Sequence, residues 1–418
     1  MTNRHPNRRT VLTGLAATAT ASAFAAPRAI AAPSGAPIRI GHQCDVTGGL
    51  ASSGYWHRKT INIAAKWFND RGGFAGRPIE IVGIDSETKV DVGIARLRQL
   101  LQDQKVDFVI GSQHGGVAVA STAIVRDEQV PYFSMSRSEG VTEDAGNPFV
   151  FRLIVNTRQT NVAAGKTMAS KVGKKWAVLY ADYIWGQSHN ASWTEAIKAA
   201  GGEVIQSIPL PLNSNDPISH ISKLNRSADG VFVALIGTDL PKAFVALPQL
   251  GFTKKPIVTA DFVFGAFDPL SNGKYVEGVW GMDTLPWELA DKDTPNLKAF
   301  RDLLGIDAHG REIGTNKNVS VGETWPIWES LSVVKLAIEG SGWKQRSDAT
   351  ALSKYIEANP NYPEGELFPQ GPLYIRPADH QAFCTINLLQ VENGRILSRD
   401  SLPPEAGYYP TKMKLAAQ

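Results

Sequence analysis

The sequence predicts an α/β protein with two lobes, each built around a doubly wound parallel sheet. First, strand-like and helix-like segments alternate from residue 38 to residue 259. Second, the pattern restarts after residue 153, which predicts a second sheet. Third, 418 residues at about 100–200 residues per domain imply two or three domains. The chain is 43% hydrophobic and 20% charged, a composition typical of folded proteins rather than disordered or collagen-like ones.

The first predicted sheet arises from repeated strand and helix units. Its strands are expected at 38–40, 79–84, 108–110, 131–134 and 149–153, with helices at 55–71, 92–101 and 117–128. In the first of these helices, Ile61, Ala64 and Phe68 follow helical spacing and form one apolar face. Gly72 and Gly73 then end the helix, because glycine accepts the left-handed conformation common at a helix C-terminus.

The second predicted sheet follows the same plan. Its strands are expected at 177–180, 203–208, 231–236 and 257–259, with helices at 157–172, 188–200, 217–224 and 240–250. Beyond residue 285 the pattern is irregular, with helices predicted at 296–304, 324–339 and 349–358 and strands near 383–391. Ligands of open α/β sheets bind beyond the carboxyl ends of the strands. Two facing sheets therefore predict a ligand cleft between their strand-end loops.

The charge distribution argues against a nucleic-acid partner. The chain has 43 basic and 40 acidic residues, and four of its arginines lie in residues 1–31, which contain no acid. The rest of the chain therefore carries a net charge of about −1. It contains no basic run with interleaved aromatic residues, so we expect no binding to nucleic acid.

Residues 1–31 have the architecture of a signal peptide. Arg8 and Arg9 precede an uncharged stretch, residues 11–26, and the pair resembles the twin-arginine export signal. Small residues offer cleavage after Ala25 or after Ala31, and we favour Ala31. The alternative is a weak membrane anchor, but the stretch falls short of the roughly 20 apolar residues that span a bilayer. We therefore expect an exported, periplasmic protein whose mature chain does not span the membrane.

The sequence lacks the common motifs for catalysis, metals and cofactors. It contains no CxxC or HExxH metal motif, no GxGxxG dinucleotide fingerprint and no GxSxG nucleophile elbow. We therefore expect no catalytic residue, no metal and no cofactor. Cys44 and Cys384 either form a disulfide, which an oxidising compartment permits, or remain separate buried thiols.

Five short segments occur in order along the chain: TGGLASSG at 47–54, NDRGG at 69–73, FVIG at 108–111, VPYFS at 130–134 and YIWG at 183–186. In order and spacing they resemble the periplasmic solute-binding proteins of ABC importers, in the group typified by the leucine/isoleucine/valine-binding protein. The resemblance covers nearly all of the mature chain. It implies a type I periplasmic binding fold, in which two lobes joined by three hinge crossings close over a small ligand. Lobe one would comprise 37–154 plus 284–375, and lobe two 155–283 plus 376–418.

The resemblance also implies where lobe one binds the ligand. In this family, the loop after the third strand and the segment after the fourth hold a ligand carboxylate through hydroxyl and backbone N–H groups. The matching positions are His114, Gly115, Gly116, Ser136, Arg137 and Ser138. Independently of the family, a helix that starts at Val117 would present unpaired N–H groups and a positive dipole end to an anion. Each of the two charged candidates has an alternative role. His114 would be a structural residue that makes a hydrogen bond, and Arg137 would pair with Glu139 or another surface acid.

On lobe two, the resemblance places an aromatic lid at Trp185 and an acid for a ligand ammonium group at Asp261. Gly237, Thr238 and Asp239 occupy a further turn that lines the ligand. A large aromatic side chain can cover an apolar or cyclic ligand, but Trp185 also suits a position in the core. Asp261 could instead pair with an arginine or cap a helix.

Three departures from the family pattern bear on the ligand. Gly115 and Gly116 replace hydroxyl residues that are common after the third strand. Ser53 stands near the first loop, where the family often has an aromatic residue. Gly237 aligns near a position of lobe two where the family has a tyrosine. A standard branched-chain amino-acid pocket is therefore not expected.

The charged candidates favour two ligand classes: His114 and Arg137 suit a carboxylate such as an aromatic or organic acid, whereas Asp261 suits an amino group. The leading hypothesis is an exported binding protein that captures a small organic solute, which could be an amino acid, an aromatic or organic acid, or an amide. It would close by hinge motion and deliver the solute to an inner-membrane ABC permease. The second hypothesis is a ligand-sensing receptor module on the same fold. The third is an enzyme that uses the cleft, with Asp261 or His114 as acid or base.

Overall fold

Repeated strand and helix units fold into parallel sheets, as the alternation of the sequence predicts. The structure is a computed structural model that describes residues 1–2, 32–211, 214, 216–236, 238–252, 255–260, 273–285, 293–315, 319, 323–413 and 415. The chain divides into two units, residues 1–31 and residues 32–418. This boundary coincides with the expected end of the signal peptide, which itself stays a prediction.

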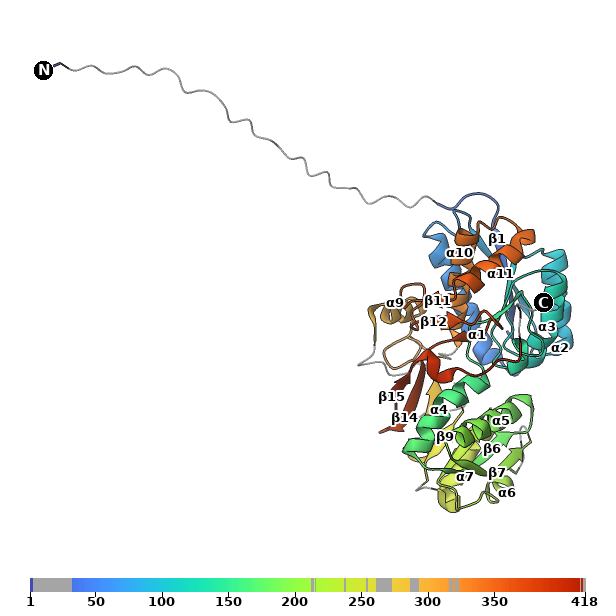
Figure 1. The fold of residues 1–418 in the computed structure, drawn as a ribbon, viewed down its shortest axis with the longest axis vertical. Helices are drawn as coiled ribbons and strands as arrows, with labels where there is room; N and C mark the ends of the chain where they lie inside the picture. Colours follow the sequence, from blue (N-terminus) through green and yellow to red (C-terminus); the bar gives the residue numbers. More distant parts are fainter. Residues whose placement is uncertain are drawn as a thin grey trace. The chain divides into compact units, whose positions relative to one another are not determined.

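The first sheet contains five parallel strands in the spatial order β2-β1-β3-β4-β5. The strands are β1 (Ile38–Cys44), β2 (Ile79–Asp85), β3 (Phe108–Gly111), β4 (Tyr132–Ser134) and β5 (Val150–Arg152). Its helices are α1 (Ala51–Asn69), α2 (Val90–Arg98), α3 (Gly115–Asp127), α10 (Trp325–Ser341) and α11 (Ala349–Ala358). Figure 1 shows α10 and α11, in orange, beside blue elements from the start of the chain, and α10 contacts α1.

The alternation of side chains along each strand explains why helices cover both faces of this sheet. In β3, Phe108 and Ile110 are buried in the cluster that contains residues of α1 and α10. Val109, between them, is buried with residues of α2 and α3. Successive strand residues point to opposite faces, so a strand that is apolar throughout must be covered on both.

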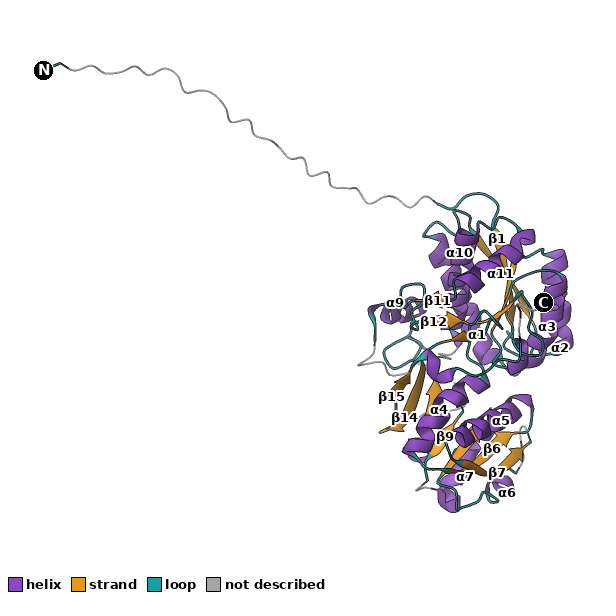
Figure 2. Ribbon diagram, in the orientation of Figure 1, coloured by secondary structure: helices purple, strands orange, loops and turns teal. Residues whose placement is uncertain are grey.

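The second sheet contains seven strands in the order β15-β14-β10-β9-β8-β6-β7. They are β6 (Lys175–Ala181), β7 (Glu203–Leu210), β8 (Gly230–Ala234), β9 (Ile257–Thr259), β10 (Trp280–Asp283), β14 (Ile386–Glu392) and β15 (Arg395–Leu402). The intervening helices are α4 (Thr157–Lys171), α5 (Ile184–Ala199), α6 (Pro217–Ile221), α7 (Asp239–Leu247) and α8 (Gly273–Val276). Trp176 and Val178 of β6 pack with α4 and α5, whereas Ala177 and Leu179 pack on the side of α7. Figure 2 shows these strands in orange among purple helices.

The second sheet is mixed: the strands predicted between residues 177 and 259 pair in parallel, and two strands from the irregular part of the sequence add antiparallel pairs. Strand β10 pairs antiparallel with β14, and β14 pairs antiparallel with β15. The β14–β15 pair is a hairpin that turns at Asn393 and Gly394, both of which have positive φ. A hairpin needs only a tight turn, whereas a parallel neighbour needs a crossover of a dozen or more residues.

The strands predicted near 383–391 are confirmed, and they belong to two different sheets. β13 (Ala382–Phe383) pairs with β12 (Leu373–Ile375), which pairs with β11 (Asn361–Tyr362) in a small antiparallel sheet. β14 then begins at Ile386 in the second sheet. One further helix, α9 (Pro295–Leu304), contacts α1.

The chain passes between the elements of the first and second sheets three times. It leaves the first sheet after β5, returns after β10 to α10, and enters the second sheet again between β13 and β14. The two lobes and their crossings thus follow from the strand order. The exact lobe boundaries, 37–154 plus 284–375 and 155–283 plus 376–418, stay a prediction.

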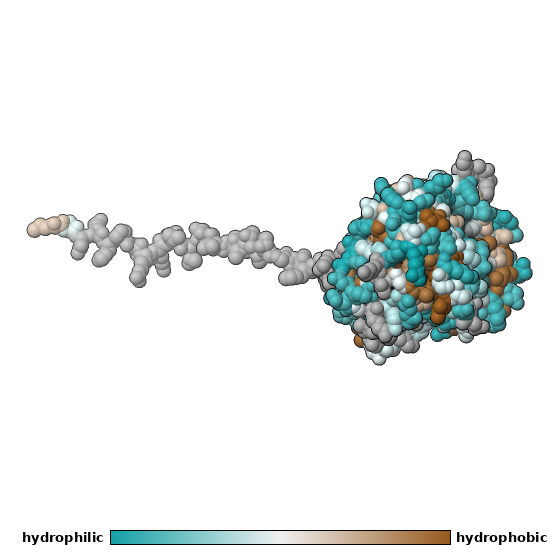
Figure 3. Space-filling model, turned by 90° about the horizontal axis from the view of Figure 1, so that it is seen from below, coloured by the Kyte–Doolittle hydropathy of each residue, from teal (hydrophilic) through white to brown (hydrophobic). Residues whose placement is uncertain are grey.

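No helix among the described residues is long and apolar enough to cross a bilayer. The face drawn in Figure 3 carries mostly hydrophilic residues, with hydrophobic side chains scattered among them.

Candidate functional site

Asp45 organises the strand-end loops of the first sheet. It follows β1, is 1% exposed, and its carboxylate accepts hydrogen bonds from Ser86 Oγ at 2.5 Å and Ser112 Oγ at 3.2 Å. The backbone N–H of Gln113 also donates to it, at 3.3 Å. Hydrogen bonds to an ionised group are the stronger ones, so this carboxylate holds the loops after β2 and β3 together. Its partners are far apart in sequence, which is why the sequence did not reveal it.

Ser53 lies close to this point of the sheet. It is half-buried in the first turn of α1, which begins at Ala51 rather than at residue 55 as predicted. The next residue, Gly54, passes so near the end of β1 that a Cβ atom there would lie 1.9 Å from the carbonyl oxygen of Asp45. Only glycine permits that approach.

His114 caps helix α3. Its Nδ1 accepts a hydrogen bond of 3.2 Å from the backbone N–H of Val117, and its backbone is extended, as a capping residue requires. The helix begins at Gly115, two residues before the predicted start. The Val117 N–H that we expected to face an anion is therefore already paired, and the structural alternative for His114 describes this side chain.

The loop after β3 and the segment after β4 meet at Gly115. A Cβ atom on Gly115 would lie 3.3 Å from Ser138 Cβ and 3.7 Å from the hydroxyl oxygens of both Ser136 and Ser138. Ser136 is buried, and its hydroxyl accepts a hydrogen bond from the N–H of Ser138. The predicted site residues of lobe one thus lie together, with the exposed Gly116 beside Val90.

The positive charge of Arg137 affects the pKa of two groups, His189 in α5 and Cys384 at the third crossing. Burial, the larger cause, and the positive charge of Arg137 together lower the pKa of His189, in α5, to about 3. Burial raises the pKa of the Cys384 thiol, with help from nearby carboxylates, and Arg137 opposes that rise. These effects fall with distance, so Arg137 lies near both groups.

Trp185 stands in the first turn of α5 and is partly buried. Its ring meets His189 edge to face, with 4.5 Å between the ring centroids, and stacks near Tyr183 at 6.1 Å. The start of α5 packs closely against the end of β6. A Cβ atom on Gly186 would lie only 2.0 Å from the carbonyl oxygen of Ala181. Trp185 therefore has one surface against the core and another toward solvent.

His189 is a residue that the sequence analysis missed. Its side chain is buried, and its Nδ1 lies 3.0 Å from Asn161 Nδ2 in α4. Among the described residues, its Nε2 has no hydrogen-bond partner. A single histidine near the start of a predicted helix carries no signal by itself, so only the fold relates it to Arg137.

The remaining candidates of lobe two lie at the start of α7 or outside the described residues. Thr238 is exposed and precedes the helix, and Asp239 is its buried first residue, with Lys242 Nζ 3.8 Å from its carboxylate. Gly237 and Asp261 fall outside the described residues.

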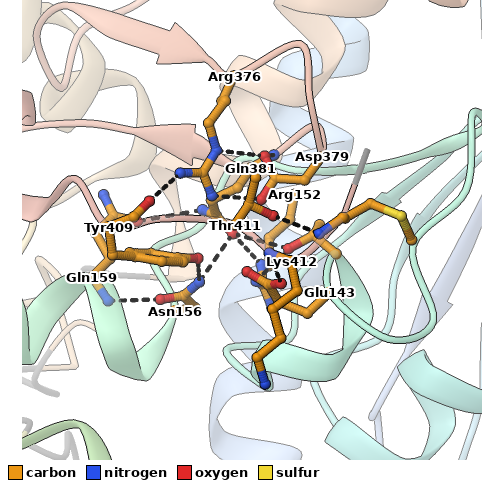
Figure 4. Close-up of polar contacts among 12 residues, drawn as sticks. Glu143, Arg152, Asn156, Gln159, Arg376, Asp379, Gln381, Tyr409, Thr411 and Lys412 are labelled. Atoms are coloured by element: carbon orange, nitrogen blue, oxygen red, sulfur yellow. Dashed lines mark hydrogen bonds and ion pairs between the residues drawn. The ribbon is translucent and has the colours of Figure 1, made fainter. Parts of the chain in front are cut away.

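A buried polar network joins the first and third crossings (Figure 4). Arg152, at the end of β5, donates hydrogen bonds to Gln381 Oε1 at 2.5 Å, to Thr142 Oγ1 at 2.6 Å and to the carbonyl oxygen of Ser138. Gln381 Nε2 donates in turn to the carbonyl oxygen of Ile154 at 3.1 Å. The site residue Ser138 is therefore tied to the crossings.

The C-terminal segment completes this network. Asn156 donates to the hydroxyl of Tyr409, and Arg376 donates to the Tyr409 carbonyl oxygen at 2.5 Å. Further along, the N–H of Lys412 donates to the Glu143 carboxylate at 2.9 Å. In Figure 4, Tyr409, Thr411 and Lys412 lie beside Arg152 and Gln381.

Gln370 joins the second and third crossings. Its Nε2 donates to the carbonyl oxygens of Thr284 at 2.8 Å and Thr385 at 2.9 Å. Cys384, next to Thr385, is a free buried thiol, as is Cys44. The disulfide alternative is therefore wrong, and the alternative of two separate thiols is confirmed.

Comparisons with known proteins agree with this architecture. Residues 37–395 match the family described as periplasmic binding protein. The Leu/Ile/Val-binding protein homolog 7 of Brucella abortus (strain 2308) is 26% identical over 352 residues, which cover 81% of this chain and 85% of the relative.

Two solved structures share the fold. One is a solute binding protein of an ABC transporter from Rhodopseudomonas palustris HaA2 in complex with p-hydroxybenzoic acid, with a TM-score of 0.73, 21% identity and coverage of 88% and 98% of the two chains. The other is the substrate binding protein of a branched-chain amino acid transporter from Streptococcus pneumoniae in complex with isoleucine, with a TM-score of 0.73, 20% identity and coverage of 88% and 100%. The chain belongs to the periplasmic binding protein family, in its leucine/isoleucine/valine-binding-protein-like group with the type I fold.

Proposed function

We propose that this protein binds a small organic carboxylate in the periplasm and delivers it to an ABC permease of the inner membrane. The observation that carries the ligand class is the setting of Arg137. Its neighbours Ser136 and Ser138 place their hydroxyl oxygens 3.7 Å from a Cβ position on Gly115, and its charge lowers the pKa of His189 in α5. A guanidinium with nearby hydroxyl groups suits a carboxylate.

Similar proteins support a carboxylate but leave the rest of the ligand open between two classes. The p-hydroxybenzoic acid and isoleucine in the two solved structures both carry a carboxylate, and only isoleucine carries an amino group. In this chain, Arg137 would hold the carboxylate, while Trp185 would cover the apolar part of the solute. Thr238 and Asp239, with Gly237 and Asp261, would supply the remaining contacts from lobe two.

The proposed mechanism is hinge closure. The loops after β3 and β4 take the carboxylate first, because Gly115, Ser136 and Ser138 already lie together. Lobe two then closes, and the binding free energy shifts the population from open to closed. The hinge motion is confined to few residues of the crossings, because the hydrogen bonds of Arg152 and Gln370 hold the neighbouring chain in place.

Thermal unfolding of the mature protein tests this function. The panel contains leucine and isoleucine, benzoate and 4-hydroxybenzoate, and benzamide, which has the shape of benzoate without its charge. A solute at 100 times its dissociation constant adds about 2.7 kcal/mol to the free energy of unfolding. We expect a carboxylate to raise the midpoint, benzamide to leave it unchanged, and Arg137→Gln to abolish the rise.

Arg126→Gln is the matched control, because Arg126 is exposed and pairs only with its neighbour Asp127 in the described contacts. Stabilisation by benzamide equal to that by benzoate, or an unchanged response of Arg137→Gln, would contradict the carboxylate site. Uptake of the labelled solute by cells with and without the chain then tests delivery to a permease.

A further inference from the structure

Three side chains with nitrogen or sulfur donors meet between β1 and α1. His42 and Cys44 are two residues apart in β1 and so point to the same face, and His57 faces them from α1. One donor atom from each lies within 4.8 Å of the other two. All three are at most 1% exposed, and none belongs to the proposed solute site.

Two nitrogen atoms of this cluster lack a partner. Among the described residues, neither His42 Nε2 nor His57 Nδ1 makes a hydrogen bond, although both are buried. Buried polar atoms are nearly always paired, so two neighbouring nitrogen atoms without a hydrogen bond require an explanation. The two imidazole rings lie 6.4 Å apart between centroids, with 42° between their planes.

A carboxylate orients one of the two rings. His57 Nε2 lies 2.7 Å from Glu323 Oε2, and both side chains are buried. Glu323 Oε1 in turn accepts a hydrogen bond of 2.8 Å from Gln113 Nε2. Histidine ligands of metal ions commonly donate their other ring N–H to a carboxylate in this way, which leaves the remaining nitrogen for the metal.

We propose that His42, Cys44 and His57 bind a thiophilic d¹⁰ cation, Zn²⁺ or Cu⁺, with Glu323 as the positioning residue for His57. Thiolate and imidazole are the donors that such cations prefer. Metal bonds of about 2.0–2.1 Å to nitrogen and about 2.3 Å to sulfur place the donors of a three-coordinate site about 3.5–4 Å apart. The observed limit of 4.8 Å therefore requires a contraction of about 1 Å, within the reach of side-chain rotation.

A proton is the competing occupant. A metal ion must displace any proton from the ring nitrogen of His57 that it binds, together with the thiol proton of Cys44. A site that holds only the proton would show no metal binding, which makes the two occupants distinguishable.

The experiment uses the full mature chain, because a fully buried site is loaded during folding. The protein is unfolded, freed of metal with a chelator, and refolded with one equivalent of Co²⁺, Zn²⁺ or, without oxygen and under reducing conditions, Cu⁺. Bound metal is measured after gel filtration. Co²⁺ adds a second readout, because a thiolate ligand produces a near-ultraviolet charge-transfer band.

We expect about one metal ion per chain and a thiolate–Co²⁺ band in the wild-type protein. The only other cysteine provides the matched control: Cys384→Ser should keep both, whereas Cys44→Ser should lose both. If Cys44→Ser does not fold, the Cys384→Ser protein decides, because Cys44 is then its sole thiol. Glu323→Gln should weaken metal binding about 10–100-fold, as loss of such a positioning residue does elsewhere.

The two cations are separated by competition. Displacement of Co²⁺ by one equivalent of Zn²⁺ assigns zinc, and displacement by Cu⁺ alone assigns copper. Absence of retained metal in all three refolding mixtures would overturn the proposal. So would a charge-transfer band that disappears in Cys384→Ser, or metal retention in a folded Cys44→Ser protein equal to that of the wild type.

Discussion

The guanidinium of Arg152 donates a 2.5 Å hydrogen bond to the side chain of Gln381, a residue 229 positions further along the chain. Both residues are fully buried. The bond joins the end of the first sheet to the last crossing into the second. Because buried polar groups are costly when unpaired, such a network is specific for one arrangement of the crossings.

Removing this guanidinium should destabilise the protein strongly. Arg152→Met removes three hydrogen bonds of the guanidinium to oxygens of Gln381, Thr142 and Ser138, and we expect the free energy of unfolding to fall by about 3 kcal/mol or more. Chemical denaturation measures the change. Arg126→Met, at an exposed position, should change it by less than about 0.5 kcal/mol. Equal effects of the two substitutions would contradict the network.

The capping role of His114 can be separated from ligand binding. His114→Ala removes the acceptor for the Val117 N–H, and we expect a loss of about 1 kcal/mol in unfolding free energy. His114→Asn, which caps helices well, should restore most of it. If His114→Ala weakens solute binding without changing stability, His114 acts as a ligand contact rather than as a cap.

The size of the side chain at position 115 should determine the affinity for the solute. The Cβ atom of Gly115→Ala would stand 3.3 Å from Ser138 Cβ, tighter than ordinary contact, and would fill the point where the two loops meet. We expect solute affinity to fall about tenfold, or about 1.4 kcal/mol, with little change in stability. Isothermal titration calorimetry measures the affinity. Gly83→Ala in β2 is the control, since nothing lies within 4 Å of a Cβ there.

The charge of Arg137 should be visible in the titration of His189. Burial, followed by Arg137, lowers the pKa of His189 to about 3. In Arg137→Gln this pKa should rise yet stay below the ordinary value near 6.5, because burial remains the larger cause. NMR titration of the histidine ring measures it. An unchanged pKa would mean that Arg137 points away from the second sheet.

Glu312 should make stability sensitive to acid. Burial disfavours its charged form, but hydrogen bonds from Lys59, Tyr55 and Thr315 outweigh burial and lower its pKa to about 2. The unfolded chain takes up this proton near the ordinary value of 4.5, before the folded chain does. The stabilisation is therefore complete above about pH 5.5 and is lost as the pH falls through 4.5 toward 2.

Comparison of the wild type with Glu312→Gln isolates this effect. The difference in unfolding free energy should be largest near neutral pH and should shrink below pH 4.5. Denaturation curves over a series of pH values provide the measurement. A difference that does not depend on pH would show that Glu312 acts through packing rather than charge.

Much of the fold was predictable because its information is local. Apolar runs such as Phe108-Val109-Ile110, with helical spacing between them, identify buried parallel strands wherever they occur. The antiparallel β14–β15 hairpin, and the sheet that each strand near 383–391 joins, were not predictable in this way. Which sheet accepts a strand depends on partners elsewhere in the chain.

The candidate site was predictable where it follows from strand ends. Gly115 follows β3, and Ser136 and Ser138 follow its parallel neighbour β4, so the order of the strands already implied that they meet. Asp45 and His189 were missed because their significance lies in contacts with residues distant in sequence. A single buried polar residue has no sequence period that distinguishes it from an exposed one.

The position of the C-terminal segment also has a consequence for biosynthesis. Tyr409 and Lys412 complete the polar network of the crossings, yet they are made after every strand of the two sheets. Chains fold from the N-terminus as they emerge from the ribosome, so the first sheet can form early while the hinge waits for residues 409–412. The nascent protein therefore lacks its complete hinge until these residues have emerged, and capture of a solute by hinge closure belongs to chains that already contain them.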